Sequence, residues 1–172
     1  QDSVLNEAAQ RIIRGHRFTV KSQRPPLIVV VTKVDVWRAL LGEIDFSPPW
    51  RFIERVGLAG VELDTIEAVS QHVRSLLLQL TPEIVNTAED LCDRVAYIPV
   101  SATGTAPVFD ETRNVWGFRP RSLKPIWTEV PLLYYFAKWE RGIIGTTRTS
   151  RKSEQTEKTS ELAAPAPSPT EE

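Results

Sequence analysis

The pattern of apolar and polar positions divides the chain into helical and extended stretches. Residues 27–31 form an unbroken apolar run that is mostly β-branched, and residues 95–101 form a second, largely apolar run. Apolar runs without alternation are typical of strands that are covered on both faces, as in a parallel sheet. We therefore predict two buried strands, each followed directly by polar residues.

A long helix is predicted between the two strands. Apolar residues recur at helical spacing over residues 64–92, and Asp64 with Glu67 three positions later matches a capping box at the start. Pro82 is expected to kink or restart this helix, because proline lacks a backbone donor and clashes with the preceding turn. A further helix is predicted before the first strand, over residues 3–15.

The remaining stretches lack a helical or alternating apolar pattern. Residues 42–63 are predicted to be an irregular insertion, and residues 107–118, PVFDETRNVWGF, are expected to form a hairpin that turns around residues 110–114. Residues 146–172 contain no aromatic side chain and are rich in Thr, Ser, Glu and Lys. Such a segment buries too little apolar surface to offset its ordering entropy, so we predict a disordered tail.

The last helix is expected to run from a cap at Thr128 to Arg141, with Pro131 tolerated in its first turn. Its stretch VPLLYYFAKW is apolar on nearly every side, which predicts burial against more than one surface. The order helix, strand, helix, strand, helix indicates an α/β layered fold with a mainly parallel sheet. Two parallel strands alone do not make a stable sheet, so we expect residues 1–145 to lack the N-terminal strands of their domain. A chain that begins at Gln1 and contains no methionine agrees with that expectation.

Composition narrows the functional classes. The 172 residues carry 21 Lys and Arg against 22 Asp and Glu, so no net field favours nucleic acid or an anionic membrane as a partner. The apolar runs are too short to span a bilayer and no signal peptide is visible, so we expect a cytoplasmic protein. Cys92 is the single cysteine, which excludes a disulfide framework, and His16 and His72 lie too far apart for a metal-ligand motif.

Polar clusters follow both predicted strands, at the end of the sheet where open α/β folds bind ligands. The clusters are Thr32-Lys33-Val34-Asp35 and Ser101-Ala102-Thr103-Gly104. TKVD resembles the [NT]-K-x-D base-recognition signature of P-loop GTPases, and the SAT of SATG resembles their S-A-[KL] signature. The two stretches stand in the same order as in that family. Thr103 departs from the usual Lys or Leu, which weakens the stacking expected on that side of the base.

The resemblance implies part of a three-layer α/β/α P-loop NTPase-type fold, with only the C-terminal half of the GTPase domain in this chain. It also implies that Asp35 accepts both donors of guanine, the ring N1–H and the exocyclic amine, in a bidentate, charge-assisted arrangement. Lys33 would pack along the plane of the base, and Thr32 would tie this loop to the phosphate loop. The backbone N–H of Ala102 would donate to the guanine O6, while Ser101 braces the turn.

The resemblance extends to the type of GTPase. The stretch from SATG through WGFRPRSLKPIWTEVPLLYYF is similar to bacterial multi-component proteins called double-GTPases of conflict systems, a type related to the TRAFAC-like GTPases. No glycine is followed by lysine and no aspartate has glycine three residues later, so neither the G-x-x-x-x-G-K-[ST] phosphate loop nor the D-x-x-G switch signature is found. The resemblance thus implies GTP or GDP as the ligand, with Mg²⁺ binding and hydrolysis dependent on a missing N-terminal half. We expect no catalytic residue within this chain.

The same residues allow other interpretations. Asp35 could be the N-cap of a helix that starts at Val36, with Lys33 simply solvated, and Ser101 and Thr103 could be ordinary turn residues. The chain would then be a non-catalytic pseudo-GTPase or an α/β interaction module. Its apolar last helix would pack against the missing half of the domain or against a protein partner.

Overall fold

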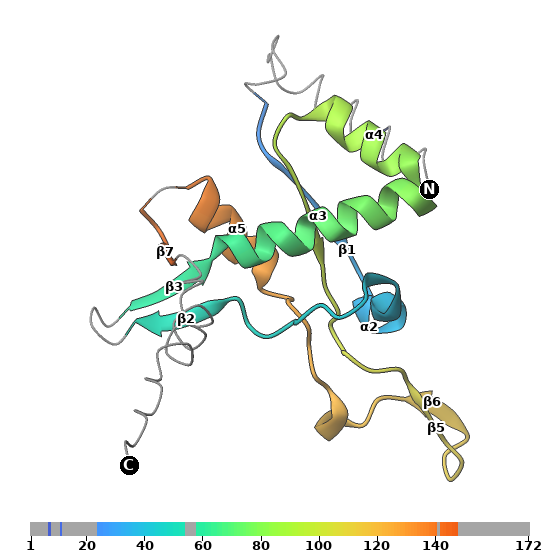
Figure 1. The fold of residues 1–172 in the computed structure, drawn as a ribbon. Helices are drawn as coiled ribbons and strands as arrows, with labels where there is room; N and C mark the ends of the chain where they lie inside the picture. The colour runs from blue at the N-terminus through green and yellow to red at the C-terminus, as the bar shows by residue number, and fades with distance from the viewer. Residues whose placement is uncertain (1–6, 8–10, 12–23, 54–57, 141, 148–172) are drawn as a thin grey trace, which may run out of the picture.

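A computed structural model describes Glu7, Arg11 and residues 24–53, 58–140 and 142–147 of the chain. In these residues the chain forms three small sheets and one long helix, and one of the sheets projects away from that helix (Figure 1). The sheets combine parallel and antiparallel pairs, so the described architecture is a mixed α/β fold. One of the sheets is purely parallel and consists of the two predicted strands.

The two ends of the chain lie largely outside the described residues. Of the predicted helix over residues 3–15, only Glu7 and Arg11 are described; both are helical, and an ion pair of 2.6 Å joins their side chains. Of the predicted tail over residues 146–172, the first two residues belong to a strand and the others lie outside the described part. The disordered tail therefore stays a prediction.

The first sheet consists of the two strands that the apolar runs predict. Strand β1 (Leu27–Val31) pairs in parallel with β4 (Val95–Pro99). Strand β4 is buried along nearly its whole length, whereas β1 is half-buried and its Val30 is 45 % exposed. The prediction of cover on both faces is thus confirmed for β4 and wrong for β1, because the long helix packs on β4.

Helices α3 (Leu63–Leu80) and α4 (Pro82–Leu91) pack beside the parallel sheet, and α3 crosses its strands (Figure 1). The helix restarts at Pro82, as predicted, and Pro82 stands in the first turn of α4, where its missing donor is tolerated. The buried face of α3 includes Ile66 and Val73, which belong to the main core cluster.

The capping box predicted at the start of α3 is wrong. The helix begins at Leu63, and its N-cap residue Glu62 makes no side-chain cap bond. Glu67 instead accepts hydrogen bonds from Lys138 Nζ at 2.6 Å and from the Tyr134 hydroxyl at 3.4 Å. The Glu67 carboxylate, which the local sequence pattern predicts to cap α3, therefore binds the last helix instead.

The core is tied together by polar contacts as well as by apolar packing. The Ser70 hydroxyl of α3 accepts the backbone N–H of Tyr97 in β4 at 2.9 Å. Arg74 of α3 donates to both carboxylate oxygens of Glu89 in α4, at 2.5 and 2.8 Å. The Tyr97 hydroxyl also donates to Glu89, and burial raises the pKa of this hydroxyl well above its ordinary value. These contacts fix α3 and α4 relative to β4.

The second sheet contradicts the prediction that residues 42–63 are irregular. Strands β2 (Trp50–Ile53) and β3 (Leu58–Glu62) form an antiparallel pair within that stretch. Strand β7 (Gly145–Thr147) joins β3 in parallel, although it comes from the far end of the described chain. No pattern within a short window of sequence indicates a strand whose partner is so distant.

The third sheet is the predicted hairpin. Strands β5 (Val108–Asp110) and β6 (Val115–Gly117) pair antiparallel and project from the body of the molecule (Figure 1). The turn between them includes Asn114, which has a φ of 52°. Three short helical elements complete the described structure: α2 (Val34–Trp37), η2 (Arg38–Leu41) and η3 (Pro120–Ser122).

The last helix, α5 (Val130–Lys138), is shorter than predicted. The expected cap, Thr128, donates to the Glu129 carboxylate at 3.0 Å and does not cap the helix. Tyr134 lies on the buried face of α5, whereas Leu132 is 62 % exposed. Within the described residues α5 is therefore uncovered on the side of Leu132, and its burial against a further surface stays a prediction.

Candidate functional site

The loops that follow β1 and β4 lie side by side at the carboxyl edge of the parallel sheet. Backbone pairing continues past the strands, because the Val100 N–H donates to the Val31 carbonyl at 2.9 Å and the Val34 N–H donates to the Val100 carbonyl at 3.0 Å. These bonds hold residues 32–35 against residues 101–104. The two predicted polar clusters are thus brought together, as expected from parallel strands.

Lys33 turns the chain from β1 into α2. Its backbone is left-handed, with a φ of 57° and a ψ of 41°, a conformation that costs a non-glycine residue roughly 1–2 kcal/mol. Its carbonyl accepts the Val36 N–H at 3.0 Å, and its side chain is exposed. The turn directs Val34, which is fully buried, into the core. Strain of this kind is common where a loop is held for ligand contact.

Asp35 and Ser101 form the centre of the site. The Ser101 hydroxyl donates to Asp35 Oδ1 and accepts the Gly104 N–H at 2.9 Å. Ser101 is only 2 % exposed, whereas Asp35 is half-buried, and Asp35 Oδ2 has no hydrogen-bond partner among the described residues. The alternative that Asp35 caps α2 is wrong: the carboxylate lies within the helix and the cap residue is Lys33. Ser101 therefore orients this carboxylate across the edge of the sheet.

A later segment of the chain braces the second loop. Ser101 and Ile126 exchange backbone hydrogen bonds at 2.9 and 2.8 Å, and the Lys124 N–H donates to the Thr103 carbonyl at 2.9 Å. Gly104 has a φ of 63°, and a Cβ at this position would lie 1.7 Å from the Lys124 carbonyl oxygen. Only glycine fits there. Sequence reasoning included Gly104 in the cluster but missed this brace, because no local signal marks Lys124 or Ile126.

The other predicted site residues lie in the same two loops. The Thr32 carbonyl accepts the indole N–H of Trp37 at 2.9 Å, a contact that the sequence did not reveal. Ala102 is exposed, and its backbone N–H has no partner among the residues that the structure describes. The Thr103 hydroxyl donates to the Thr105 carbonyl at 3.1 Å, so it is engaged within its own loop.

The site offers a small set of groups for a ligand. Asp35 supplies an oriented acceptor with a free oxygen, Ala102 supplies a free backbone donor, and Lys33 supplies an exposed ammonium. A carboxylate beside a backbone N–H is complementary to a planar ring that presents adjacent donors next to an acceptor. In the described ranges, no cluster of three or more His, Cys, Asp or Glu side chains could hold a metal ion.

Comparison with known proteins identifies no relative of this chain at the similarity required for significance. No protein-family model matches the chain, and no curated protein or solved structure shows significant similarity to it. None of the helices in the described part is long and apolar enough to cross a membrane. The class that the fold defines is therefore a mixed α/β protein with two polar loops joined at the carboxyl edge of parallel strands.

Proposed function

We propose that the chain provides the guanine-selecting part of a GTPase-like domain of the α/β/α P-loop NTPase type. The observation that carries this proposal is the hydrogen bond between Ser101 and Asp35, which joins the TKVD and SAT stretches at one edge of the sheet. Either stretch alone is a short motif with many accidental matches. Their direct contact, in the order found in P-loop GTPases, supports a common role in one pocket.

Asp35 would select the base. Guanine presents its N1–H and its exocyclic amine side by side, and the two carboxylate oxygens would accept one donor each. Asp35 Oδ1 already accepts from Ser101, but an ionised carboxylate has about four acceptor positions, so both oxygens remain available. Adenine lacks this pair of donors and would leave the carboxylate desolvated and unpaired, at a cost of roughly 1–3 kcal/mol or more.

The neighbouring residues would complete the pocket. The free N–H of Ala102 would donate to the guanine O6, which adjoins the N1–H read by Asp35. The aliphatic stem of Lys33 would pack on the plane of the base. The Thr32 carbonyl is fixed by Trp37 and the Thr103 carbonyl by Lys124, so both residues would form the border of the pocket. Both belong to the loops that carry the TKVD and SAT stretches.

Phosphate binding would lie with other elements. The G-x-x-x-x-G-K-[ST] and D-x-x-G signatures are not found in this sequence. GTP or GDP binding, Mg²⁺ coordination and hydrolysis are therefore proposed for a longer protein that contains this chain, whose N-terminal half would hold the phosphates and the metal. This chain would contribute base selection and no catalytic residue.

Nucleotide titration monitored by NMR tests the proposal on the chain itself. Adding GMP to the ¹⁵N-labelled chain should shift the amide signals of Ala102 and Gly104, and AMP should shift them far less. Asp35→Asn should weaken GMP binding by roughly tenfold or more and improve XMP binding, because the amide can donate to the second carbonyl of xanthine. Asp90→Asn on the exposed side of α4 is the matched control. Equal shifts with GMP and AMP, or unchanged GMP affinity of Asp35→Asn, would refute base selection.

A second candidate function is that of a non-catalytic interaction module. An apolar hollow of about 690 Å³ lies between α5 and the second sheet, and Trp50, Leu133 and Ile143 are among its lining residues. Leu132 on the same helix is exposed. A protein partner packed on α5 would cover this surface. Absence of any GMP-dependent shift in the NMR experiment would favour this module over the nucleotide site.

A further inference from the structure

The β5–β6 hairpin carries apolar side chains that the core does not use. The exposed apolar residues of the hairpin and its exit are Val108, Phe109, Val115, Trp116, Phe118 and Leu123. Trp116 is 68 % exposed. In the described structure, none of these side chains belongs to a core cluster or packs against one. Exposed apolar residues gathered on one short element, with Phe109 and Trp116 paired on the same face, are typical of an interaction surface.

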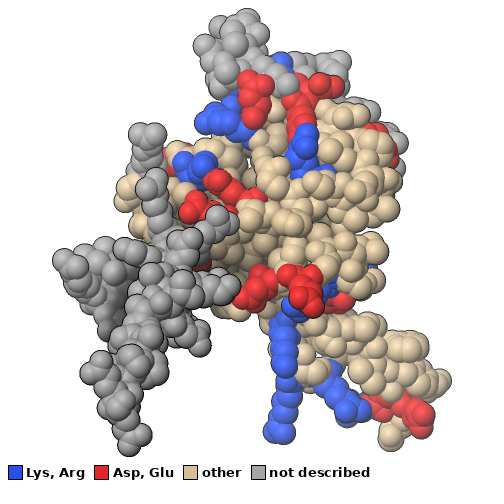
Figure 2. Space-filling view, in the orientation of Figure 1, with Lys and Arg blue, Asp and Glu red and all other residues tan. Residues whose placement is uncertain are grey.

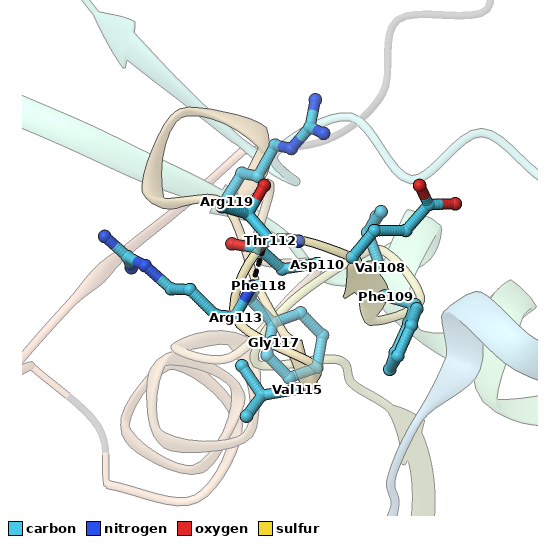
Figure 3. Close-up of a pocket in the computed structure, with 10 residues that line it drawn as sticks. Val108, Phe109, Asp110, Thr112, Arg113, Val115, Gly117, Phe118 and Arg119 are labelled. Carbon is cyan, nitrogen blue, oxygen red and sulfur yellow. Dashed lines mark hydrogen bonds between the residues drawn. The ribbon is translucent and has the colours of Figure 1, made fainter.

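The hairpin is built as a rigid element. The rings of Phe109 and Trp116 pair across the strands with their centroids 5.3 Å apart. In the turn, the Asp110 carboxylate accepts the N–H groups of Thr112 and Arg113 at 3.0 and 3.2 Å (Figure 3). The brace between Lys124 and the loop after β4 fixes the root of the hairpin. A preorganised element loses little conformational entropy when it binds a partner.

Positive charge surrounds the apolar surface of the hairpin. Arg113, Arg119, Arg121 and Lys124 lie in or just after it, and Figure 3 shows the guanidinium groups of Arg113 and Arg119 reaching away from the strands. On the face in Figure 2, blue side chains project beside the hairpin. The chemistry favours a partner surface that is apolar with carboxylates at its rim. The two acidic residues of the hairpin, Asp110 and Glu111, lie at its tip, and the Asp110 carboxylate is engaged within the turn.

A groove with the complementary chemistry lies on the same chain, between the loop that precedes β2 and the first turns of α3. Its volume is about 550 Å³, and it is lined by Ile44, Asp45, Asp64, Thr65, Ala68, Val69 and His72. Figure 2 shows red side chains gathered over this loop. Among the described lining residues there is no lysine or arginine. The groove therefore offers apolar side chains and two exposed carboxylates, Asp45 and Asp64.

The charge of Asp45 is held by its own loop. The Ser47 hydroxyl and backbone N–H donate to Asp45 Oδ1 at 2.7 and 2.9 Å. The hydrogen bond from the Ser47 side chain is the main reason that the pKa of this carboxyl lies below its ordinary value. Asp45 is therefore ionised at neutral pH, and its second oxygen accepts no hydrogen bond from another described residue.

We propose that the β5–β6 hairpin of one copy docks into this groove of a second copy of the chain. The Phe109–Trp116 pair would cover the apolar side chains of the groove, and Arg113 and Arg119 would pair with its two aspartates. Within one copy the hairpin projects from the body away from α3, so the contact forms between copies (Figure 1). The two surfaces differ, so the contact is heterologous and leads to a ring or an open chain of subunits. It is independent of nucleotide selection.

Sedimentation velocity over a concentration series, combined with charge reversal, tests this contact. The average mass of the wild-type chain should rise above that of the monomer with concentration, and added salt should reverse the rise. Arg113→Glu with Arg119→Glu, or Asp45→Lys with Asp64→Lys, should each weaken association at least tenfold. An equimolar mixture of the two double variants should associate again, because each reversed hairpin then meets a groove of opposite charge.

Matched variants separate this contact from a general charge effect. Glu83→Lys with Asp90→Lys makes the same change in net charge as the groove variant, on exposed positions of α4, and should leave association unchanged. Circular dichroism verifies that each variant is folded, and the mixture provides rescue within one sample. A wild-type chain that stays monomeric at every concentration overturns the proposal. So does a mixture that stays monomeric, or a loss confined to the hairpin variant, which would place the hairpin against a different surface of the second copy.

Discussion

The loop around Ser101 and the β5–β6 hairpin are neighbours in the chain and share the Lys124–Ile126 brace, yet they present opposite surfaces. The loop buries a hydroxyl and pairs it on both sides, leaving a few directed polar groups open. The hairpin exposes aromatic rings and surrounds them with cations. Directed polar groups in a fixed frame suit a small ligand, whereas a broad aromatic surface suits another protein. One rigid segment thus supports two surfaces with different chemistry.

Paired substitutions, one in or beside the candidate site and one in or just after the hairpin, test how far this contrast extends. The largest difference is expected for tryptophan. Trp127 is 3 % exposed, and its indole N–H donates to the carbonyls of Phe46 and Ser47, both at 3.1 Å. Trp127→Ala should lower the free energy of unfolding by about 3–5 kcal/mol, whereas Trp116→Ala should change it by less than about 0.5 kcal/mol. Urea denaturation at low protein concentration measures both, and similar losses would contradict the contrast.

Glycine substitutions should give the next largest difference. Gly104→Ala combines a positive φ with a Cβ that overlaps the Lys124 carbonyl, so we expect a loss of about 2–4 kcal/mol in the free energy of unfolding. Gly117→Ala in β6 is the control, because its Cβ would meet no atom within 4 Å. The control should change stability by less than about 0.5 kcal/mol. A tolerated Gly104→Ala would show that the brace is not rigid.

Serine substitutions separate buried from surface hydrogen bonds. Ser101→Ala leaves the Asp35 carboxylate and the Gly104 N–H without their shared partner, which should cost about 1–3 kcal/mol of unfolding free energy. Ser122→Ala removes a bond to the Arg119 carbonyl at the surface and should cost less than about 0.5 kcal/mol. Thermal and urea unfolding measure both changes. Equal costs would mean that the Ser101 network contributes no more than a surface bond.

The smallest difference concerns two of the residues with left-handed backbone, Lys33 and Asn114. Lys33→Gly should raise the free energy of unfolding by about 0.5–1 kcal/mol, because relief of the positive φ exceeds the added entropy of the unfolded chain. Asn114→Gly in the hairpin turn should change it by less, since asparagine adopts this conformation more readily. Lys33→Gly should still weaken GMP binding in the NMR titration. A destabilised Lys33→Gly would indicate that its side chain holds the loop.

The features that the sequence predicted are those with local causes. The apolar runs of β1 and β4, the restart at Pro82 and the hairpin around residues 110–114 each depend on neighbouring residues. The adjacency of Asp35 and Ser101 also followed, because parallel strands carry their C-terminal loops to the same edge. The other features depend on distant partners, and a local pattern cannot contain them.

Two features show why contacts between residues far apart in the sequence were not predicted. Strand β7 exists through its pairing with β3, and Glu67 is engaged by Lys138 of α5 instead of the start of its own helix. In the candidate site, the same limit hid the role of Lys124, whose carbonyl restricts position 104 to glycine. The sequence therefore predicted which residues meet at the site but not the segment that supports them.

The bridge between Ser101 and Ile126 also has a consequence for the two adjoining amides of this loop. The Ser101 amide proton is locked in a short bridge within the interior, while that of Ala102 faces water. Deuterium should therefore replace the second proton quickly and the first only when the bridge opens. The boundary between protected and labile protons thus falls between two consecutive residues of one loop.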